Sequence, residues 1–109
     1  MAEDIAAEFL TAQDYRVVAR NHRCPVGEID VIAWDCDVLC FVEVRSVSDG
    51  SPMDALKTIT PSKIRRVIAA ARDYVDQLRG PWPLMRFDAV GIFLADPPQV
   101  TLIREAFEE

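Results

Sequence analysis

Apolar residues recur with two different periods along the first third of the chain. Within residues 2–13 they fall at helical spacing, with Ile5, Ala6, Phe9 and Leu10 on one side. This spacing predicts an amphipathic helix. Residues 15–23 instead alternate between apolar and polar side chains, which predicts a half-exposed first strand.

The alternation is strongest in residues 27–45, where two β-branched apolar runs flank a short polar turn. This pattern is typical of a β-hairpin. With Cys36 and Asp37 as a two-residue loop, Asp35 pairs with Val38. A loop with one residue more would send the charged side chains of the two strands to opposite faces of the sheet.

Both hairpin strands carry carboxylates within otherwise apolar runs. The even loop sets Asp30 opposite Glu43 and Glu28 opposite Arg45. Opposed carboxylates repel each other, so we expect a cation between Asp30 and Glu43. Strict alternation predicts that Glu28, Asp30, Ile32 and Trp34 share one face and that Ile29, Val31 and Ala33 share the other.

The second half of the chain continues the alternation of helix and strand. Residues 46–61 read as a loop, and a long amphipathic helix follows with Thr60 as its N-cap. Residues 85–94 predict a fourth strand, residues 99–104 a last edge strand, and residues 105–109 a short tail.

The resulting order is α-β-β-β-α-β-β. Short turns favour antiparallel neighbours, whereas the long helix permits one crossover, so the expected fold is α/β with a mixed β-sheet flanked by helices. The length of 109 residues and an apolar content of 50% fit one domain spanning residues 1–109.

Composition limits the location and partners of the protein. No apolar run approaches the ~20 residues of a membrane span, so we expect no membrane association. The acidic start of the chain is unlike a signal peptide. The three cysteines form no CxxC pair, which argues against a disulfide framework or a zinc site and favours a reduced, cytoplasmic protein.

The net charge of −6 argues against general nucleic-acid binding, but the charges are unevenly distributed. Residues 57–66 carry four cations and no acid, and a second basic segment contains Arg16, Arg20 and Arg23. The single histidine, His22, lies in that second segment and is expected on the surface. A local basic surface beside an acidic pocket is therefore compatible with the negative net charge of the whole chain.

The pair Asp30 and Glu43 has the chemistry of a magnesium site. Carboxylate oxygens are the hard ligands that Mg²⁺ prefers, and the backbone carbonyl of Val44 offers a third. Such an ion stabilises charge on a phosphodiester and lowers the pKa of its bound water. Arg45, two residues after Glu43, would meet the phosphate or the attacking water.

Several segments resemble the YraN-like uncharacterised bacterial family, which is related to the restriction-endonuclease-like PD-(D/E)xK superfamily. The most specific match joins residues 27–30, GEID, to residues 41–44, FVEV. The other matching residues are Glu3, Ala6, Ala7, Asn21, Arg23, Lys63, Arg86, Phe87, Asp88, Ala106 and Phe107.

The resemblance implies a restriction-endonuclease-like fold and a metal-dependent endonuclease acting on DNA or structured nucleic acid. Asp30 and Glu43 would be the Mg²⁺ ligands, and Glu3 would join them from the first helix. Lys63 would contact phosphate, as would Arg23 and Arg66 on the basic segments. DNA is the favoured partner, and a homodimer is expected by analogy only.

One residue departs from the superfamily motif: Arg45 stands where the motif has lysine. Lysine can take part in proton transfer, whereas arginine stays protonated and offers a planar fork. Arg45 could hold a phosphate, or it could bridge the carboxylates and replace the metal. Three functions therefore stay open. They are an active Mg²⁺-dependent nuclease, a nuclease-fold binding or scaffold protein without the chemistry, and a protein-interaction module whose basic helix binds an acidic partner.

Overall fold

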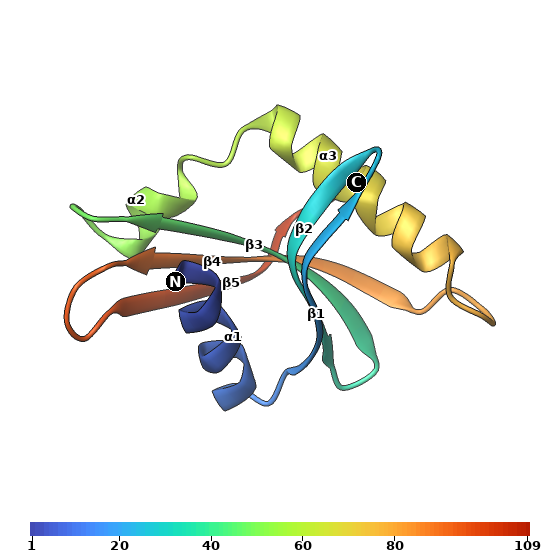
Figure 1. Ribbon diagram of the computed structural model, residues 1–109, viewed down its shortest axis with the longest axis horizontal. Helices are drawn as coiled ribbons and strands as arrows, with labels where there is room; N and C mark the ends of the chain where they lie inside the picture. The colour runs from blue at the N-terminus through green and yellow to red at the C-terminus, as the bar shows by residue number, and fades with distance from the viewer.

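A computed structural model describes all 109 residues and shows three helices and five strands (Figure 1). The predicted order of the main elements is confirmed, with one short additional helix. The elements are α1 (Ala2–Ala12), β1 (Arg16–Cys24), β2 (Gly27–Asp35), β3 (Val38–Val47), α2 (Pro52–Leu56), α3 (Pro61–Asp76), β4 (Leu84–Phe93) and β5 (Gln99–Phe107).

The strands form one mixed sheet in the order β1-β2-β3-β4-β5. Only β3 and β4 run parallel, because α2 and α3 lie between them in the chain and provide the crossover. The predicted two-residue loop is also confirmed, since Asp35 pairs with Val38. The long helix begins as predicted, with the Thr60 hydroxyl accepting a hydrogen bond from the Lys63 amide.

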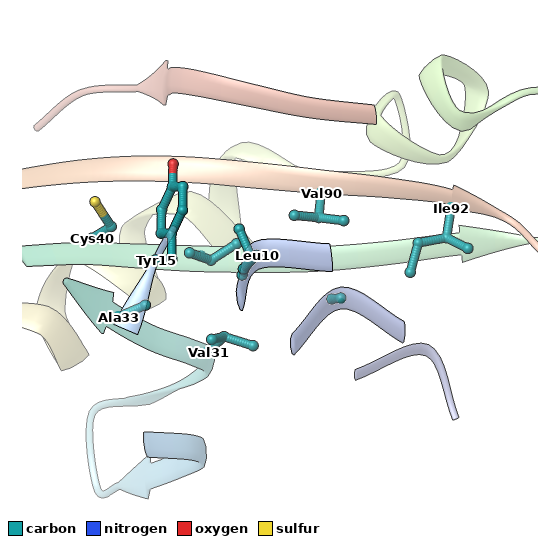
Figure 2. Packing of buried hydrophobic residues seen from close by; sticks show 9 residues of the cluster. Leu10, Tyr15, Val31, Ala33, Cys40, Val90 and Ile92 are labelled. Carbon is teal, nitrogen blue, oxygen red and sulfur yellow. The ribbon is translucent and has the colours of Figure 1, made fainter. Parts of the chain in front are cut away.

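Helices cover both faces of the sheet. On one face, Leu10 and Ala6 of α1 pack against buried residues of β2, β3 and β4. Figure 2 shows the Leu10 side chain in this cluster together with Val31 and Val90. On the opposite face, α3 buries its apolar stripe, including Val67 and Val75, against the sheet. Glu43 points to the α3 face, since it alternates with Val42 of the α1 cluster.

The prediction of strict alternation in β2 is wrong at Ile29. Ile29 and Ile32 both belong to the cluster beneath α3, whereas Val31 belongs to the cluster beneath α1. The β1–β2 hairpin therefore changes the face that it presents near Asp30. The partner position in β1 is Asn21, which has a φ of 51°, a left-handed conformation that asparagine tolerates.

Two boundaries differ from those predicted. The loop contains α2, which is started by a capping box between Ser51 and Asp54. The last strand continues to Phe107, because the ring of Phe107 stacks on Phe87 and gives residues 105–107 a buried partner. No helix is both long enough and apolar enough to span a bilayer.

Candidate functional site

Asp30 lies where the sheet splits. The β2–β3 ladder is paired from Asp35–Val38 as far as Val31–Val42, and there it ends. Oδ2 of Asp30 accepts a hydrogen bond of 2.8 Å from the amide of Val44. A side-chain carboxylate thus takes the place of the backbone carbonyl that a continued ladder would have supplied, and Asp30 is fixed beside β3.

Glu43 is the buried partner of Asp30, with a residue exposure of 1%. Burial and the neighbouring Asp30 carboxylate both disfavour its charge and raise the pKa of Glu43 to about 8. Its Oε1 atom is buried and has no hydrogen-bond partner. The arrangement expected from the register, two carboxylates facing each other, is therefore present and is only partly compensated.

Two cations flank this pair from different elements. Nε of Arg45 is 3.2 Å from Oε2 of Glu43, without hydrogen-bond geometry, and Nζ of Lys63 is 4.0 Å from the same oxygen. The Lys63 side chain is only 13% exposed. The first turn of α3 thus brings Lys63 to the same carboxylate that Arg45 of β3 approaches.

The predicted opposition of Glu28 and Arg45 is wrong. Glu28 instead accepts a hydrogen bond of 3.1 Å from Nζ of Lys63 and lies 3.5 Å from Nε of Arg23. The hydrogen bond and charge of Lys63 lower the pKa of Glu28. The reason is the separation of β2 from β3 beyond Val31, which carries Glu28 towards α3. Glu28 therefore orients Lys63.

The basic residues predicted to contact phosphate lie close to one another. Arg23 and Arg66 line one shallow pocket of about 230 Å³ together with Gly27 and Glu28. Gly27 permits this approach, because a Cβ there would lie 2.3 Å from the carbonyl oxygen of Arg66. Lys63 joins the same surface through Glu28.

Glu3 is not joined to the carboxylate pair in this structure. It lies on α1, which packs on the face opposite α3, and it makes no ion pair or hydrogen bond with Asp30 or Glu43. Its neighbour Asp4 accepts a hydrogen bond from Arg20 of β1 and forms an ion pair with it.

Residues 2–92 match the family described as "Uncharacterised protein family UPF0102". The chain belongs to the UPF0102 family. It is 43% identical over 93 residues to a UPF0102 protein of Chlorobaculum parvum, covering 83% of this chain and 70% of the relative. It is 40% identical over 111 residues to one of Solibacter usitatus, covering 98% of this chain and 83% of the relative. The predicted YraN-like membership is confirmed.

A second polar cluster of this UPF0102 protein lies on the α1 face of the sheet. Arg86 donates hydrogen bonds of 2.8 and 3.0 Å to Asp88, one of 2.8 Å to Asp35 and one of 2.9 Å to the Tyr15 hydroxyl. Asp88 is fully buried and also accepts from Tyr15 and from the amide of Glu105. These bonds raise the pKa of Arg86. The cluster has its hydrogen bonds satisfied, which indicates a structural role.

In the sequence, Arg86 and Asp88 stand out only as positions that match the family, and nothing there predicts this cluster. Their alternation on one strand was the available signal, but the partners Tyr15 and Asp35 come from distant parts of the chain. The contrast with Glu43 is instructive, because Asp88 is equally buried yet fully bonded, whereas Glu43 keeps an unpartnered oxygen.

The residues around Glu43 fit a divalent cation. Asp30 and Glu43 supply adjacent carboxylates, and the unpartnered Oε1 of Glu43 provides an acceptor with no competing protein donor. An ion such as Mg²⁺ binds through one or two carboxylates and retains several waters. Asp30 and Glu43 are thus the two residues of this chain suited to hold it.

Proposed function

We propose that this UPF0102 protein is a Mg²⁺-dependent nuclease-like enzyme that hydrolyses phosphodiesters of DNA or structured nucleic acid. The observation that carries the proposal is the buried Glu43 carboxylate beside that of Asp30, with one Glu43 oxygen unpartnered and two cations nearby. Burying the Glu43 carboxylate beside a second carboxylate costs stability unless a cation compensates it, so this arrangement supports a use beyond folding.

Asp30 and Glu43 would hold the metal, which supplies an activated water and stabilises charge on the phosphate. Lys63, fixed by Glu28 and facing Glu43, is suited to neutralise a non-bridging phosphate oxygen. Arg45 would offer its planar guanidinium to the same group. Each of these actions places positive charge where the transition state accumulates negative charge.

The start of α3 adds support for an anionic ligand. Lys63, Arg65 and Arg66 lie in or beside its first turn, which contains no acid. Cations are unfavourable at the positive end of a helix dipole, and a bound phosphate relieves that cost. With Arg23, these residues form a basic surface next to the carboxylate pair on a protein whose total charge is −6.

A second candidate is a nuclease-fold protein that binds nucleic acid without cutting it. The ion pair between Arg45 and Glu43 favours this alternative, because an arginine that occupies the carboxylates competes with a metal. The position of Lys63 favours the enzyme. Arg45 stands where the superfamily motif has lysine, but α3 supplies Lys63 to the same carboxylate pair.

The test combines metal binding with cleavage. Titration with Mg²⁺ and Mn²⁺ is followed by thermal shift and calorimetry for the parent, Glu43→Gln and the exposed control Glu8→Gln. Cleavage is followed on supercoiled plasmid, linear duplex, single-stranded RNA and a synthetic four-way junction. We expect metal-dependent cleavage by the parent and Glu8→Gln, and none by Glu43→Gln.

Other outcomes separate the two candidates. Metal and nucleic-acid binding without cleavage, together with a gain of cleavage in Arg45→Lys, would identify the protein as a binding protein that has lost the chemistry. Absence of any metal-dependent stabilisation at millimolar concentrations would overturn the metal site itself. Binding through Lys63 should weaken with salt, and Lys63→Ala should reduce the salt slope by about 1.

We also propose that the protein is cytoplasmic and forms a homodimer. Three free cysteines, one of them exposed at Cys36, fit a reducing compartment. Light scattering coupled to gel filtration, with and without a four-way junction, tests the dimer. A monomer under both conditions would reject it.

A further inference from the structure

A second cluster of ligating side chains lies between β1 and α3. His22 and Cys24 come from β1, and Asp73 comes from the middle of α3. One imidazole nitrogen, the thiol sulfur and one carboxylate oxygen all lie within 4.8 Å of one another. All three residues are half-buried, and no ion pair links them.

One ring nitrogen of His22 is buried and lacks a partner. This atom, Nε2, has no hydrogen-bond partner, and the residue is half-buried rather than on the surface as its sequence context predicts. The ring instead packs edge-on against Tyr74, with centroids 5.2 Å apart. A buried polar atom without a partner loses its hydrogen bonds to water and gains none in return, so such atoms in a folded protein require an explanation.

We propose that His22, Cys24 and Asp73 form a binding site for a borderline-soft divalent metal ion, with Zn²⁺ as the representative ion. Imidazole, thiolate and carboxylate are the three ligand types that Zn²⁺ takes in proteins. Three protein ligands leave one tetrahedral position for water. Hard ions such as Mg²⁺ prefer oxygen ligands and are not expected here.

The surrounding structure holds the three ligands in place. Asn21, with its left-handed backbone, precedes His22 at the point where the hairpin changes face, and His22 and Cys24 then both project towards α3. On the helix, Gln77 donates a hydrogen bond of 3.0 Å to Oδ2 of Asp73. Outer partners of this kind orient ligands, and their loss typically weakens metal binding 10- to 100-fold.

Binding would displace the thiol proton of Cys24, whose sulfur lies 3.5 Å from the carbonyl oxygen of Gly27 and donates a hydrogen bond to it. Ligand–ligand distances at a tetrahedral zinc ion are about 3.5 Å, so the cluster needs only a small contraction. The ion would link β1 directly to α3 and stabilise the hairpin against the helix. This site is separate from the Asp30–Glu43 pair and does not depend on the proposed function.

The sequence did not indicate this cluster. Without a CxxC pair it argued against zinc, because a local spacing rule cannot see a ligand set shared by a strand and a distant helix. The face change at Asn21 and the packing of α3 bring the three side chains together.

The experiment uses full-length protein without an affinity tag. Co²⁺ is titrated as a spectroscopic substitute, and Zn²⁺ by competition, with parent, Cys24→Ser, His22→Gln and Asp73→Asn. The matched controls are Cys36→Ser in an exposed turn and Asp76→Asn, exposed on the same helix. Because His22 is the only histidine, its imidazole NMR signals report ligation directly.

We expect the parent to bind one equivalent with a thiolate-to-cobalt charge-transfer band, visible bands of a tetrahedral ion and a higher melting temperature with Zn²⁺. Cys24→Ser should lose the charge-transfer band, and each ligand variant should bind at least 10-fold more weakly. Both controls should match the parent. Gln77→Ala should retain the band with about 10-fold weaker binding.

Some results would overturn the site. No thiolate band and no change of the His22 imidazole signals in the parent would do so. Loss of the band in Cys36→Ser with retention in Cys24→Ser would assign the metal to the exposed thiol instead. Glu43→Gln should still bind Co²⁺ through Cys24, and this separates the outcome from that of the Mg²⁺ site.

Discussion

The substitution Glu43→Gln should make the protein more stable at alkaline pH while removing its metal response. Glu43 is buried beside Asp30, and this environment raises the pKa of its carboxyl to about 8, above the unfolded value of 4.5. An amide has a similar size and no charge at any pH. It can also donate a hydrogen bond to the Asp30 carboxylate, which two ionised carboxylates cannot do.

The sign of the effect follows from the two pKa values. Below about pH 4.5 the carboxyl of Glu43 is protonated in both the folded and the unfolded chain, so this proton adds no pH dependence. Between pH 4.5 and about 8 the unfolded chain releases the proton and the folded chain retains it. The free energy of unfolding of the parent therefore falls as the pH rises through this window, and the loss is complete above pH 8.

The magnitude follows from the width of the window. Each pH unit within it corresponds to about 1.4 kcal/mol, so three units from pH 5 to pH 8 give about 4 kcal/mol as an upper value. The folded protein relaxes around a newly charged Glu43 and so recovers part of this energy, which leaves an expected difference of at least about 2 kcal/mol. The advantage of Glu43→Gln over the parent should grow by that amount between pH 5 and pH 8.

The assay is urea unfolding at both pH values, followed by circular dichroism, for the parent, Glu43→Gln and Glu8→Gln. At pH 8 the measurements are repeated with Mn²⁺, which should stabilise the parent by about 2.7 kcal/mol at 100 times its dissociation constant but leave Glu43→Gln unchanged. A stability difference between parent and Glu43→Gln that is the same at pH 5 and pH 8 would refute the reasoning.

Three further substitutions test how the fold holds the site. Arg86→Met leaves the buried Asp88 without its cation and should lower the free energy of unfolding in urea by about 3–5 kcal/mol. The decrease should be smaller when Asp88→Asn is added, and a decrease below about 1 kcal/mol for Arg86→Met alone would contradict the buried pair. Gly27→Ala places a Cβ 2.3 Å from the carbonyl oxygen of Arg66 and should cost about 1–3 kcal/mol by thermal unfolding, so an unchanged melting temperature would show that β2 and α3 are not in contact there. Leu10→Ala removes a fully buried side chain of α1 and should cost about 3–5 kcal/mol in calorimetry, whereas a cost near zero would place α1 off the sheet.

Much of the fold was predictable because its signals are local. The even loop at Cys36–Asp37 fixed the hairpin register, and Thr60 fixed the start of α3. The facing of Asp30 and Glu43 followed from the same register. These predictions rest on periodicity and capping, which act over a few residues and need no knowledge of distant neighbours.

The failures share a physical cause. Glu28 was assigned to Arg45 on the assumption that β2 stays paired with β3, but β2 leaves the ladder beyond Val31 and carries Glu28 to Lys63. The contact of His22 with α3 was missed because the same change of face turns that part of β1 towards the helix. A bend in a hairpin depends on the elements that pack against it, so the alternation of apolar and polar residues along the strand does not predict it.

The sequence by itself determined that this protein is a mixed α/β domain of the UPF0102 family with two carboxylates facing across a hairpin. Only the tertiary structure decided which cations meet them, because Lys63 arrives from a helix that is distant in the chain. The tertiary structure likewise brought His22 and Cys24 to Asp73. Spacing along a strand sets which side chains share a face, whereas the packing of helix on sheet sets what those side chains touch.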